Sequence, residues 1–300
     1  MQTKQQIQQL LAVAGVSPNK RLGQHFLIDL NLMRLLVDSA NIRPSDVVLE
    51  VGCGTGSLTE ALGPRAGRII AVEVDRTLAD IAQDQLAGSE NVDIINTDIL
   101  ENKSALNSAV VKAIDQARQQ CSGRLLLVAN LPYNVAAPVV LNLVAGPLVA
   151  DSMCVTVQKE VADRMTAAPG GKDYGSLSIL LSATGEVKTI RTLKPTVFWP
   201  RPQVDSAMVS FVRQNEKASR IENMALFGET VSFFMGHRRK MLRTCGKLAR
   251  AKPGYANLWP RIFERCSINS TRRPAELPPE DYIVMANAYD KINKQTRREL

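Results

Sequence analysis

Apolar, strand-like segments alternate with helix-like segments through much of the first two thirds of this chain. Short runs rich in Val, Ile and Leu predict strands at 46–51, 68–74, 92–96, 124–129 and 153–158. Segments with apolar residues three and four positions apart predict helices between these strands. This alternation is typical of a mainly parallel sheet with helices on both faces. Two further extended runs, at 186–191 and 206–212, are expected to form an antiparallel edge of the same sheet.

The first predicted strand ends in an acid and runs into three glycines at alternate positions. Residues 47–56 read VVLEVGCGTG, and a helix-like segment follows. Glycine tolerates positive φ and has no Cβ, so the backbone can approach a ligand closely, and the helix start offers free N–H groups. The spacing is GxGxG rather than the GxGxxG of dinucleotide-binding turns, and no GxxxxGK[ST] P-loop occurs. The pattern resembles the S-adenosylmethionine loop of Rossmann-like methyltransferases, and the alternative is a turn with a structural role alone.

Polar residues also follow three later strands of the predicted sheet. Ligands of open α/β sheets bind outside the carboxyl ends of the strands, so these side chains are candidates for a site. Glu73 has two acceptor oxygens, enough for both hydroxyls of a ribose. Asp98 is placed to accept a hydrogen bond from the amine of an adenine, and Asn130 follows the 124–129 strand. Each acid taken alone is more often a helix cap or a surface residue.

Residues 130–133 read Asn-Leu-Pro-Tyr and form the most specific motif of the chain. Proline makes this turn stiff and leaves backbone carbonyls free to face a ligand. The exocyclic amine of adenine is a poor nucleophile, because its lone pair is delocalised into the ring. The Asn130 side-chain oxygen and the Leu131 carbonyl are two acceptors that can hold its two hydrogens, while Tyr133 offers a face for the base to stack on. The alternative is an ordinary turn after Pro132 with a core tyrosine.

Bulk composition limits the class of protein. The 300 residues are 45% hydrophobic and 22% charged, which is typical of a globular chain. The glutamine-rich start has no apolar core of a signal peptide, and no apolar run reaches the roughly 18 residues of a membrane span. Five dispersed cysteines without CxxC spacing argue against a disulfide framework and against zinc. We therefore expect a cytoplasmic protein with reduced thiols, no metal and no membrane partner.

The net charge of +8 is concentrated in the last third of the chain. Residues 214–300 hold 17 Lys and Arg against 9 Asp and Glu, so the rest of the chain is balanced. The pattern beyond 214 is helical, with helices expected at 221–235, 239–249, 259–266 and 279–293. We expect two domains, 1–213 with the sheet and a small all-helical 214–300. A polyanion such as RNA is the expected partner of the second, and the alternative is a basic surface that serves solubility.

Seven ordered blocks of this chain resemble the small-subunit ribosomal RNA adenine dimethyltransferase family. They are KRLGQHFL at 20–27, the GxGxG turn at 52–56, NLPYN at 130–134, QKEVADR at 158–164, YGSLS at 174–178, FWPRPQVDSA at 198–207 and RRKML at 238–242. Together they span most of residues 19–245, and seven blocks in order are far more specific than any one of them.

The resemblance implies a fold, a reaction and a set of site residues. The fold is a Rossmann-like class I S-adenosylmethionine-dependent methyltransferase with a seven-stranded sheet and a helical C-terminal domain. The reaction is the dimethylation at N6 of two adjacent adenosines in the 3′-terminal hairpin of small-subunit rRNA, on a precursor of the 30S subunit, by a protein expected to be a monomer. The implied cofactor residues are His25, Leu27, Gly52, Gly54, Gly56, Glu73, Asp98 and Asn130. The implied catalytic residues are Asn130, Leu131, Pro132, Tyr133 and Phe198, and the implied RNA-binding residues are Arg238, Arg239, Lys240 and Arg243.

Three features depart from the pattern of that family. Cys53 stands where a proline is usual, and Ala136 and Ala137 replace a polar pair. The stretch between Asp98 and Asn130 is longer than usual, with a helix-like insert around 104–121. The rival interpretations are a large-subunit rRNA adenine methyltransferase of the macrolide-resistance type and a non-catalytic RNA-binding assembly factor on the same fold.

Overall fold

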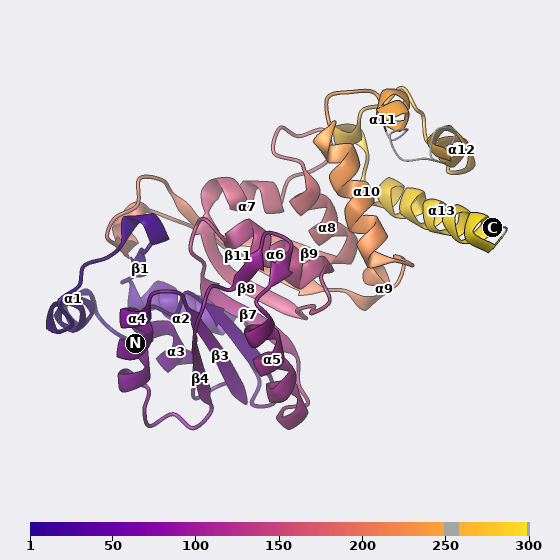
Figure 1. Ribbon diagram of the computed structural model, residues 1–300. Helices are drawn as coiled ribbons and strands as arrows, with labels where there is room; N and C mark the ends of the chain where they lie inside the picture. The colour runs from indigo at the N-terminus through magenta and orange to yellow at the C-terminus, as the bar shows by residue number, and fades with distance from the viewer. Residues whose placement is uncertain (249–257, 299–300) are drawn as a thin grey trace. The chain divides into compact units, whose positions relative to one another are not determined.

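The computed structural model describes residues 1–248 and 258–298 (Figure 1). The chain divides into two compact units. The first comprises residues 1–162 and 187–212, and the second comprises 163–186 and the part of the chain that follows 212. The chain therefore enters the second unit twice. The segment 163–186, which the sequence pattern placed with the sheet, belongs to the second unit.

A seven-stranded sheet forms the centre of the first unit, in the order β4-β3-β2-β7-β8-β11-β9. The strands are β2 (Val47–Val51), β3 (Arg68–Glu73), β4 (Val92–Asn96), β7 (Leu125–Asn130), β8 (Ser152–Gln158), β9 (Gly185–Leu193) and β11 (Ser206–Arg213). Neighbours from β4 to β8 pair in parallel, and β11 pairs with β8 antiparallel. The helices around it are α1 (Lys4–Val13), α2 (Leu30–Ser39), α3 (Ser57–Leu62), α4 (Arg76–Gln85), α5 (Ser108–Gln120) and α6 (Ala136–Ala145), and α7 (Lys159–Met165) leads into the second unit. The mainly parallel sheet expected from the alternation is confirmed.

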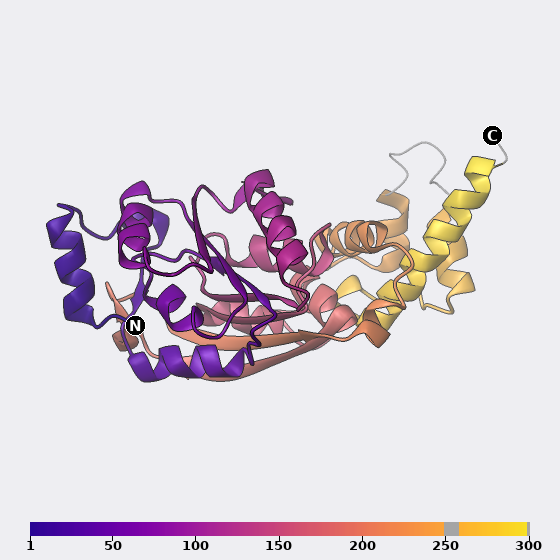
Figure 2. The ribbon, with the colours of Figure 1, turned by 90° about the horizontal axis from the view of Figure 1, so that it is seen from below.

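Both faces of the central strands are covered, which explains why their sequences are almost continuously apolar. In β2, Val48 belongs to one core with Leu36 of α2 and Leu58 of α3. Val47 and Leu49 point to the opposite face, because side chains alternate along a strand, and α5 packs against β2 and β3 there. Figure 2 shows α2 and α5 on opposite sides of the sheet.

The strand order reverses at β2. The chain places β3 and β4 on one side of β2 and then crosses to add β7 on the other side. The carboxyl ends of β2 and β7 therefore flank a topological switch point, where open α/β sheets bind their ligands. The GxGxG turn follows β2 and the NLPY turn follows β7.

Two short pairings were not expected from the sequence. β1 (Phe26–Leu27) pairs antiparallel with β10 (Phe198–Trp199), which brings two of the family-like blocks together. The insert before α5 contains a hairpin of β5 (Leu100–Asn102) and β6 (Ala105–Leu106), so the helix expected from 104 begins only at Ser108.

The second unit is mainly helical over its described residues. Its helices are α8 (Ser176–Thr184), α9 (Asn215–Ala218), α10 (Met224–Gly236), α11 (Leu242–Leu248), α12 (Leu258–Arg265) and α13 (Pro279–Arg298). An aromatic cluster joins three of these helices, since Trp259 of α12 stacks on Tyr289 of α13 and meets Phe234 of α10 edge-on. The last residue of the helix expected at 239–249 lies outside the described residues. No helix in the described part of the chain is both long and apolar enough to cross a membrane.

Candidate active site

A cavity opens where β2, β3 and β7 end, and every residue that lines it belongs to the first unit. Its walls come from the GxGxG turn, the end of β3, residues 97–99, the NLPY turn and the 22–27 segment. Ten of the residues predicted from the sequence line it: His25, Leu27, Gly52, Gly54, Glu73, Asp98, Asn130, Leu131, Pro132 and Tyr133. The fold thus brings the glycine motif and the NLPY motif, about eighty residues apart in the sequence, into one site.

The glycine turn, residues 52–56, requires glycine at positions 52 and 54. Gly52 and Gly54 have φ of +77° and +58°, in the region that disfavours a Cβ. A Cβ on Gly52 would lie 2.8 Å from Cγ of Pro132, and one on Gly54 would lie 2.9 Å from Cε1 of Phe26. The missing side chain of Gly52 therefore lets the glycine turn pack directly against the NLPY turn, and that of Gly54 leaves room for Phe26.

Glu73 is held at the end of β3 by the glycine turn. Its Oε2 accepts a hydrogen bond from the Gly54 N–H at 2.8 Å, and its Oε1 accepts one from the Asp75 N–H at 3.0 Å. Burial raises the pKa of Glu73, and these two backbone donors oppose that shift. Each carboxylate oxygen can accept a further hydrogen bond, so two hydroxyls of a ribose have acceptors here.

Glu50 is a second buried carboxyl group that lines the cavity, and the sequence analysis did not assign it a role. Thr59 donates a hydrogen bond to its Oε2 at 2.7 Å. Burial raises the pKa of Glu50 to about 8; the Thr59 hydrogen bond opposes this shift, and the neighbouring Glu73 adds to it. In the sequence, Glu50 could have been recognised as an acid inside an otherwise apolar strand that leads into the glycines.

Asn130 is oriented by the segment that precedes β1. Its Nδ2 donates to the backbone carbonyl of His25 at 2.8 Å. The amide is thereby fixed with Oδ1 as its free acceptor, and no group in the described residues donates to that oxygen. The Leu131 N–H donates to the carbonyl of Thr156 at 3.0 Å, while the Leu131 carbonyl itself has no donor among the described residues. Two neighbouring acceptors are therefore available at this turn.

Tyr133 is held from two sides. Its hydroxyl shares a 2.8 Å hydrogen bond with Oγ of Ser206, which is fully buried on β11. Its ring centroid lies 5.4 Å from that of His25, whose Nδ1 is 2.7 Å from the carbonyl oxygen of Pro200. Burial raises the pKa of Tyr133, and the Ser206 hydrogen bond opposes the shift. The sequence analysis missed Ser206 as a partner, although it lies in the FWPRPQVDSA block.

Two predicted site residues do not line the cavity. Phe198 is only 3% exposed and lies in the core beside Leu27, its partner in the β1–β10 pair. Neither face of this ring is accessible to a base as it stands. Gly56 is the left-handed N-cap of α3, and a Cβ there would meet Leu86 at 3.0 Å. Asp98 does line the cavity, but it is exposed and its Oδ1 accepts the Leu100 N–H at 2.9 Å.

The four predicted RNA-binding residues lie in the second unit and differ in their surroundings. Arg239, Lys240 and Arg243 are exposed. Arg238 is half-buried, and its guanidinium donates to the carbonyls of Gly171 and Lys172 at 3.3 and 3.0 Å. Arg238 therefore ties the turn after α10 to the 163–186 segment of the same unit.

The family profile described as "Ribosomal RNA adenine dimethylase" matches residues 15–291. The chain belongs to this family. Proteins named "Ribosomal RNA small subunit methyltransferase A" from Geobacillus sp. (strain WCH70) and Pediococcus pentosaceus are 34% and 37% identical to it. These matches cover 95% and 93% of this chain and 96% and 92% of the relatives. The family resemblance inferred from the seven blocks is confirmed.

Two solved structures share the fold of this rRNA adenine dimethylase. A dimethyladenosine transferase from Plasmodium falciparum superposes with a TM-score of 0.70 at 21% identity, covering 88% of this chain and 96% of that chain. The 23S rRNA methyltransferase ErmE superposes with a TM-score of 0.60 at 22% identity, covering 88% and 99%. The expected methyltransferase fold is therefore confirmed.

The family uses S-adenosylmethionine as its methyl donor, which confirms the expected cofactor. The residues of the cavity fit this molecule. Gly52 and Gly54 line the cavity without side chains, and Glu73 presents its carboxylate beside the glycine turn. Glu50 and Glu73 are buried carboxyl groups at the cavity, and a positively charged sulfonium bound beside them would favour their ionised forms.

Proposed function

We propose that this dimethylase modifies N6 of two adjacent adenosines in the 3′-terminal hairpin of small-subunit rRNA during assembly of the small subunit. One observation carries the proposal. The open acceptors Asn130 Oδ1 and Leu131 O lie on a turn that packs against the glycine turn through Gly52 and Pro132. The names of the full-length relatives support the small-subunit target.

The residues act by holding the amine rather than by removing its proton. S-adenosylmethionine supplies an electrophilic methyl group when it is bound. Asn130 Oδ1 and the Leu131 carbonyl accept the two N6 hydrogens, which favours a pyramidal nitrogen with its lone pair directed away from them. Held in this way by Asn130 and Leu131, the nitrogen would be placed to accept that methyl group, and its surplus proton would then leave to water. Preorganised dipoles of this kind supply much of the rate enhancement in many enzymes.

The target adenosine has to leave its stack to reach this turn. Tyr133 offers a half-buried ring for the flipped base, and base–aromatic stacking contributes about 1–3 kcal/mol. Phe198 is the sequence-based candidate for the opposite face, and that role requires its ring to leave the core position it occupies.

The second unit is proposed to bind the rRNA. Arg239, Lys240 and Arg243 are exposed cations in the part of the chain that carries the whole charge surplus. Such residues contact phosphates, and their contribution weakens as salt increases. The proposed partner is a pre-30S particle in the cytoplasm. The enzyme is proposed to act as a monomer.

The decisive experiment supplies labelled S-adenosylmethionine to the protein with undermethylated small or large ribosomal subunits and then maps the modified adenines. The proposal expects dimethylation of two adjacent adenosines near the 3′ end of the small-subunit rRNA. Label in the large subunit would favour the macrolide-resistance type of enzyme, and no label with intact RNA binding would favour an assembly factor. Asn130→Ala should lower transfer at least about 100-fold and leave the Kd for the cofactor within about threefold, while Asn31→Ala on the exposed side of α2 should change neither.

A further inference from the structure

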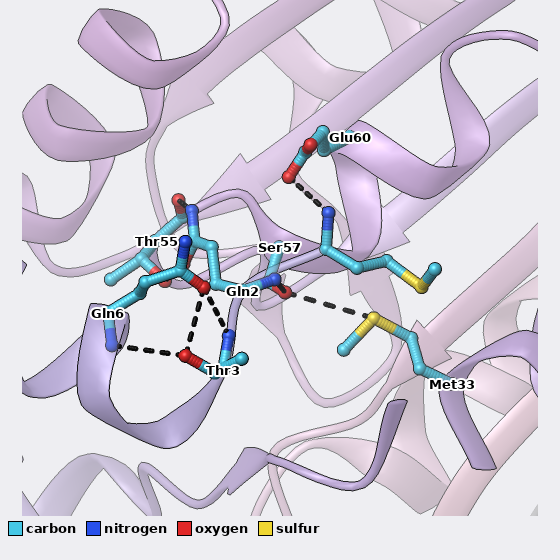
Figure 3. Close-up of polar contacts among 8 residues, drawn as sticks. Gln2, Thr3, Gln6, Met33, Thr55, Ser57 and Glu60 are labelled. Carbon is cyan, nitrogen blue, oxygen red and sulfur yellow. Dashed lines mark hydrogen bonds and ion pairs between the residues drawn. The ribbon is translucent and has the colours of Figure 1, made fainter. Parts of the chain in front are cut away.

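The start of the chain is fastened to the outer side of the glycine turn through Gln2. Its side chain contacts Thr55 twice, since Nε2 donates to the Thr55 carbonyl at 3.0 Å and Oε1 accepts from the Thr55 hydroxyl at 2.6 Å. Its backbone N–H donates to Oγ of Ser57 at 2.7 Å, and that hydroxyl lies 3.8 Å from Sδ of Met33 (Figure 3). Gln2 is only 5% exposed, which is unusual for this residue type. An uncharged polar side chain is thus buried with both its amide nitrogen and its amide oxygen hydrogen-bonded.

The same segment continues into a wall of the cavity. Thr3 and Gln6 form a capping box that starts α1, and Figure 3 shows both beside Gln2. One turn later Ile7 is fully buried in a small core with Leu78 of α4. Ile7 and Leu78 both line the cavity. Gln2 therefore sets where α1 begins, and α1 presents Ile7 to the cofactor space.

Thr55 lies between two glycines that hold positive φ, so this part of the turn has little intrinsic preference for one conformation. Glu73 holds the turn from the inner side through the Gly54 N–H. Gln2 holds it from the outer side through both polar groups of Thr55. Gln2 itself does not line the cavity, whereas Thr55 and Ser57 do. Any effect of Gln2 on a bound molecule therefore has to pass through these two residues.

We propose that Gln2 is a positioning residue for S-adenosylmethionine, which fixes the glycine turn from outside, and that Ile7 of α1 forms part of the wall of the cofactor site. This inference rests on the proposed assignment of the glycine turn to the cofactor. A turn that adopts its binding conformation only part of the time binds with a Kd raised by the inverse of that fraction. Loss of the Gln2 amide therefore affects cofactor affinity and leaves the chemistry at the NLPY turn unchanged.

The test compares Gln2→Ala with Gln8→Ala, a matched change at an exposed position of α1. Calorimetry with S-adenosylmethionine and with its demethylated product should show a Kd about tenfold higher for Gln2→Ala, which corresponds to about 1.4 kcal/mol. The KM for the cofactor should rise by a similar factor, while kcat at saturating cofactor and the KM for RNA stay within twofold. Gln8→Ala should match the wild type. Gln2→Glu keeps the size of the side chain and one acceptor but places an oxygen against the Thr55 carbonyl. This variant should therefore bind S-adenosylmethionine no more tightly than Gln2→Ala.

Equal Kd values for Gln2→Ala and Gln8→Ala would overturn the proposal, and so would a fall in kcat with an unchanged Kd. Wild-type protein that fails to bind the cofactor would instead overturn the proposed function. If Gln2→Ala does not fold, amide exchange of the wild type decides. Exchange of residues 2–11 and 54–58 should slow together when the demethylated cofactor is added, and unchanged exchange of 2–11 would refute the inference.

Discussion

The contact between the glycine turn and the NLPY turn is the packing on which the site depends, and Gly52→Ala tests it. The new methyl group would meet two atoms of the Pro132 ring, Cγ at 2.8 Å and Cδ at 3.0 Å. Neither atom can move freely, because the ring is part of the backbone of the NLPY turn. We expect the substitution to push the two turns apart.

The cost has two parts that can be separated. A residue with a Cβ at a left-handed φ costs about 1–2 kcal/mol, and forcing a methyl group into a packed site costs about 1–3 kcal/mol. Alanine also restricts the unfolded chain, which stabilises the folded state by about 0.4–1 kcal/mol. The free energy of unfolding should therefore fall by about 2–4 kcal/mol for Gly52→Ala. Gly15 has a similar φ of +68° and nothing within 4 Å of a built Cβ, so Gly15→Ala should lose only about 1 kcal/mol.

The assay is urea unfolding of both variants followed by circular dichroism, together with methyl transfer to undermethylated subunits. Gly52→Ala should be less stable than Gly15→Ala by about 1–3 kcal/mol and should lose most of its transfer activity even where it is fully folded. Equal stability of the two variants would refute the close packing of the turns. Full activity in Gly52→Ala would refute the view that this packing aligns the acceptors of the NLPY turn with the cofactor.

Four further substitutions test other parts of the molecule. Ser206→Ala removes the hydrogen-bond partner of Tyr133, so kcat should fall by roughly three- to tenfold, with the cofactor Kd unchanged in calorimetry. Glu50 titrates near 4.5 when unfolded and has a pKa raised to about 8 by burial, so the folded state holds its proton over that interval and stability decreases as pH rises from 4.5 to about 8. Glu50→Gln should remove this decrease in thermal unfolding between pH 5 and 9 and should be most stabilising at the upper end. Arg239→Ala should weaken RNA binding and reduce the slope of log K for RNA against log salt concentration by about one unit, without altering stability. Arg238→Ala should lower the melting temperature, because the substitution removes the hydrogen bonds to two backbone carbonyls.

Each of these changes has a matched control. Ser210→Ala lies on the same strand, away from the NLPY turn, and should leave kcat unchanged. Glu90→Gln replaces an exposed carboxyl group and should leave the pH dependence of stability as in the wild type. Loss of RNA binding with Arg238→Ala but not with Arg239→Ala would contradict the assignment of roles to these two arginines.

The sequence predicted what local pattern determines. The apolar runs of β2, β3, β7 and β8 are buried on both faces, so each run is long enough to be recognised and the sheet follows from their alternation with helices. The glycine turn and the NLPY turn could be placed at one edge, because parallel strands end together. Their direct contact through Gly52 and Pro132 could not be predicted, since it depends on the crossing from β4 to β7.

Contacts between residues far apart in the sequence could not be predicted from local patterns. β1 and β10 have two residues each, too few to show a period, and their pairing buries Phe198, which the family resemblance had implied as a catalytic residue. The Ser206–Tyr133 hydrogen bond spans 73 positions, and the Gln2–Thr55 pair spans 53. The sequence around a polar residue such as Gln2 does not indicate that the residue is buried, so its role can be seen only when the fold is known.

The double entry of the chain into the second unit limits how the enzyme can be dissected or recombined. α8 is buried along nearly its whole length, and its partners α10 and α13 come from beyond residue 213 (Figure 1). A fragment cut at that point would expose an apolar helix in the middle of its own sequence and would tend to aggregate. Any chimera that exchanges substrate preference between relatives therefore needs crossovers on both sides of α8 as well as one at the C-terminal segment.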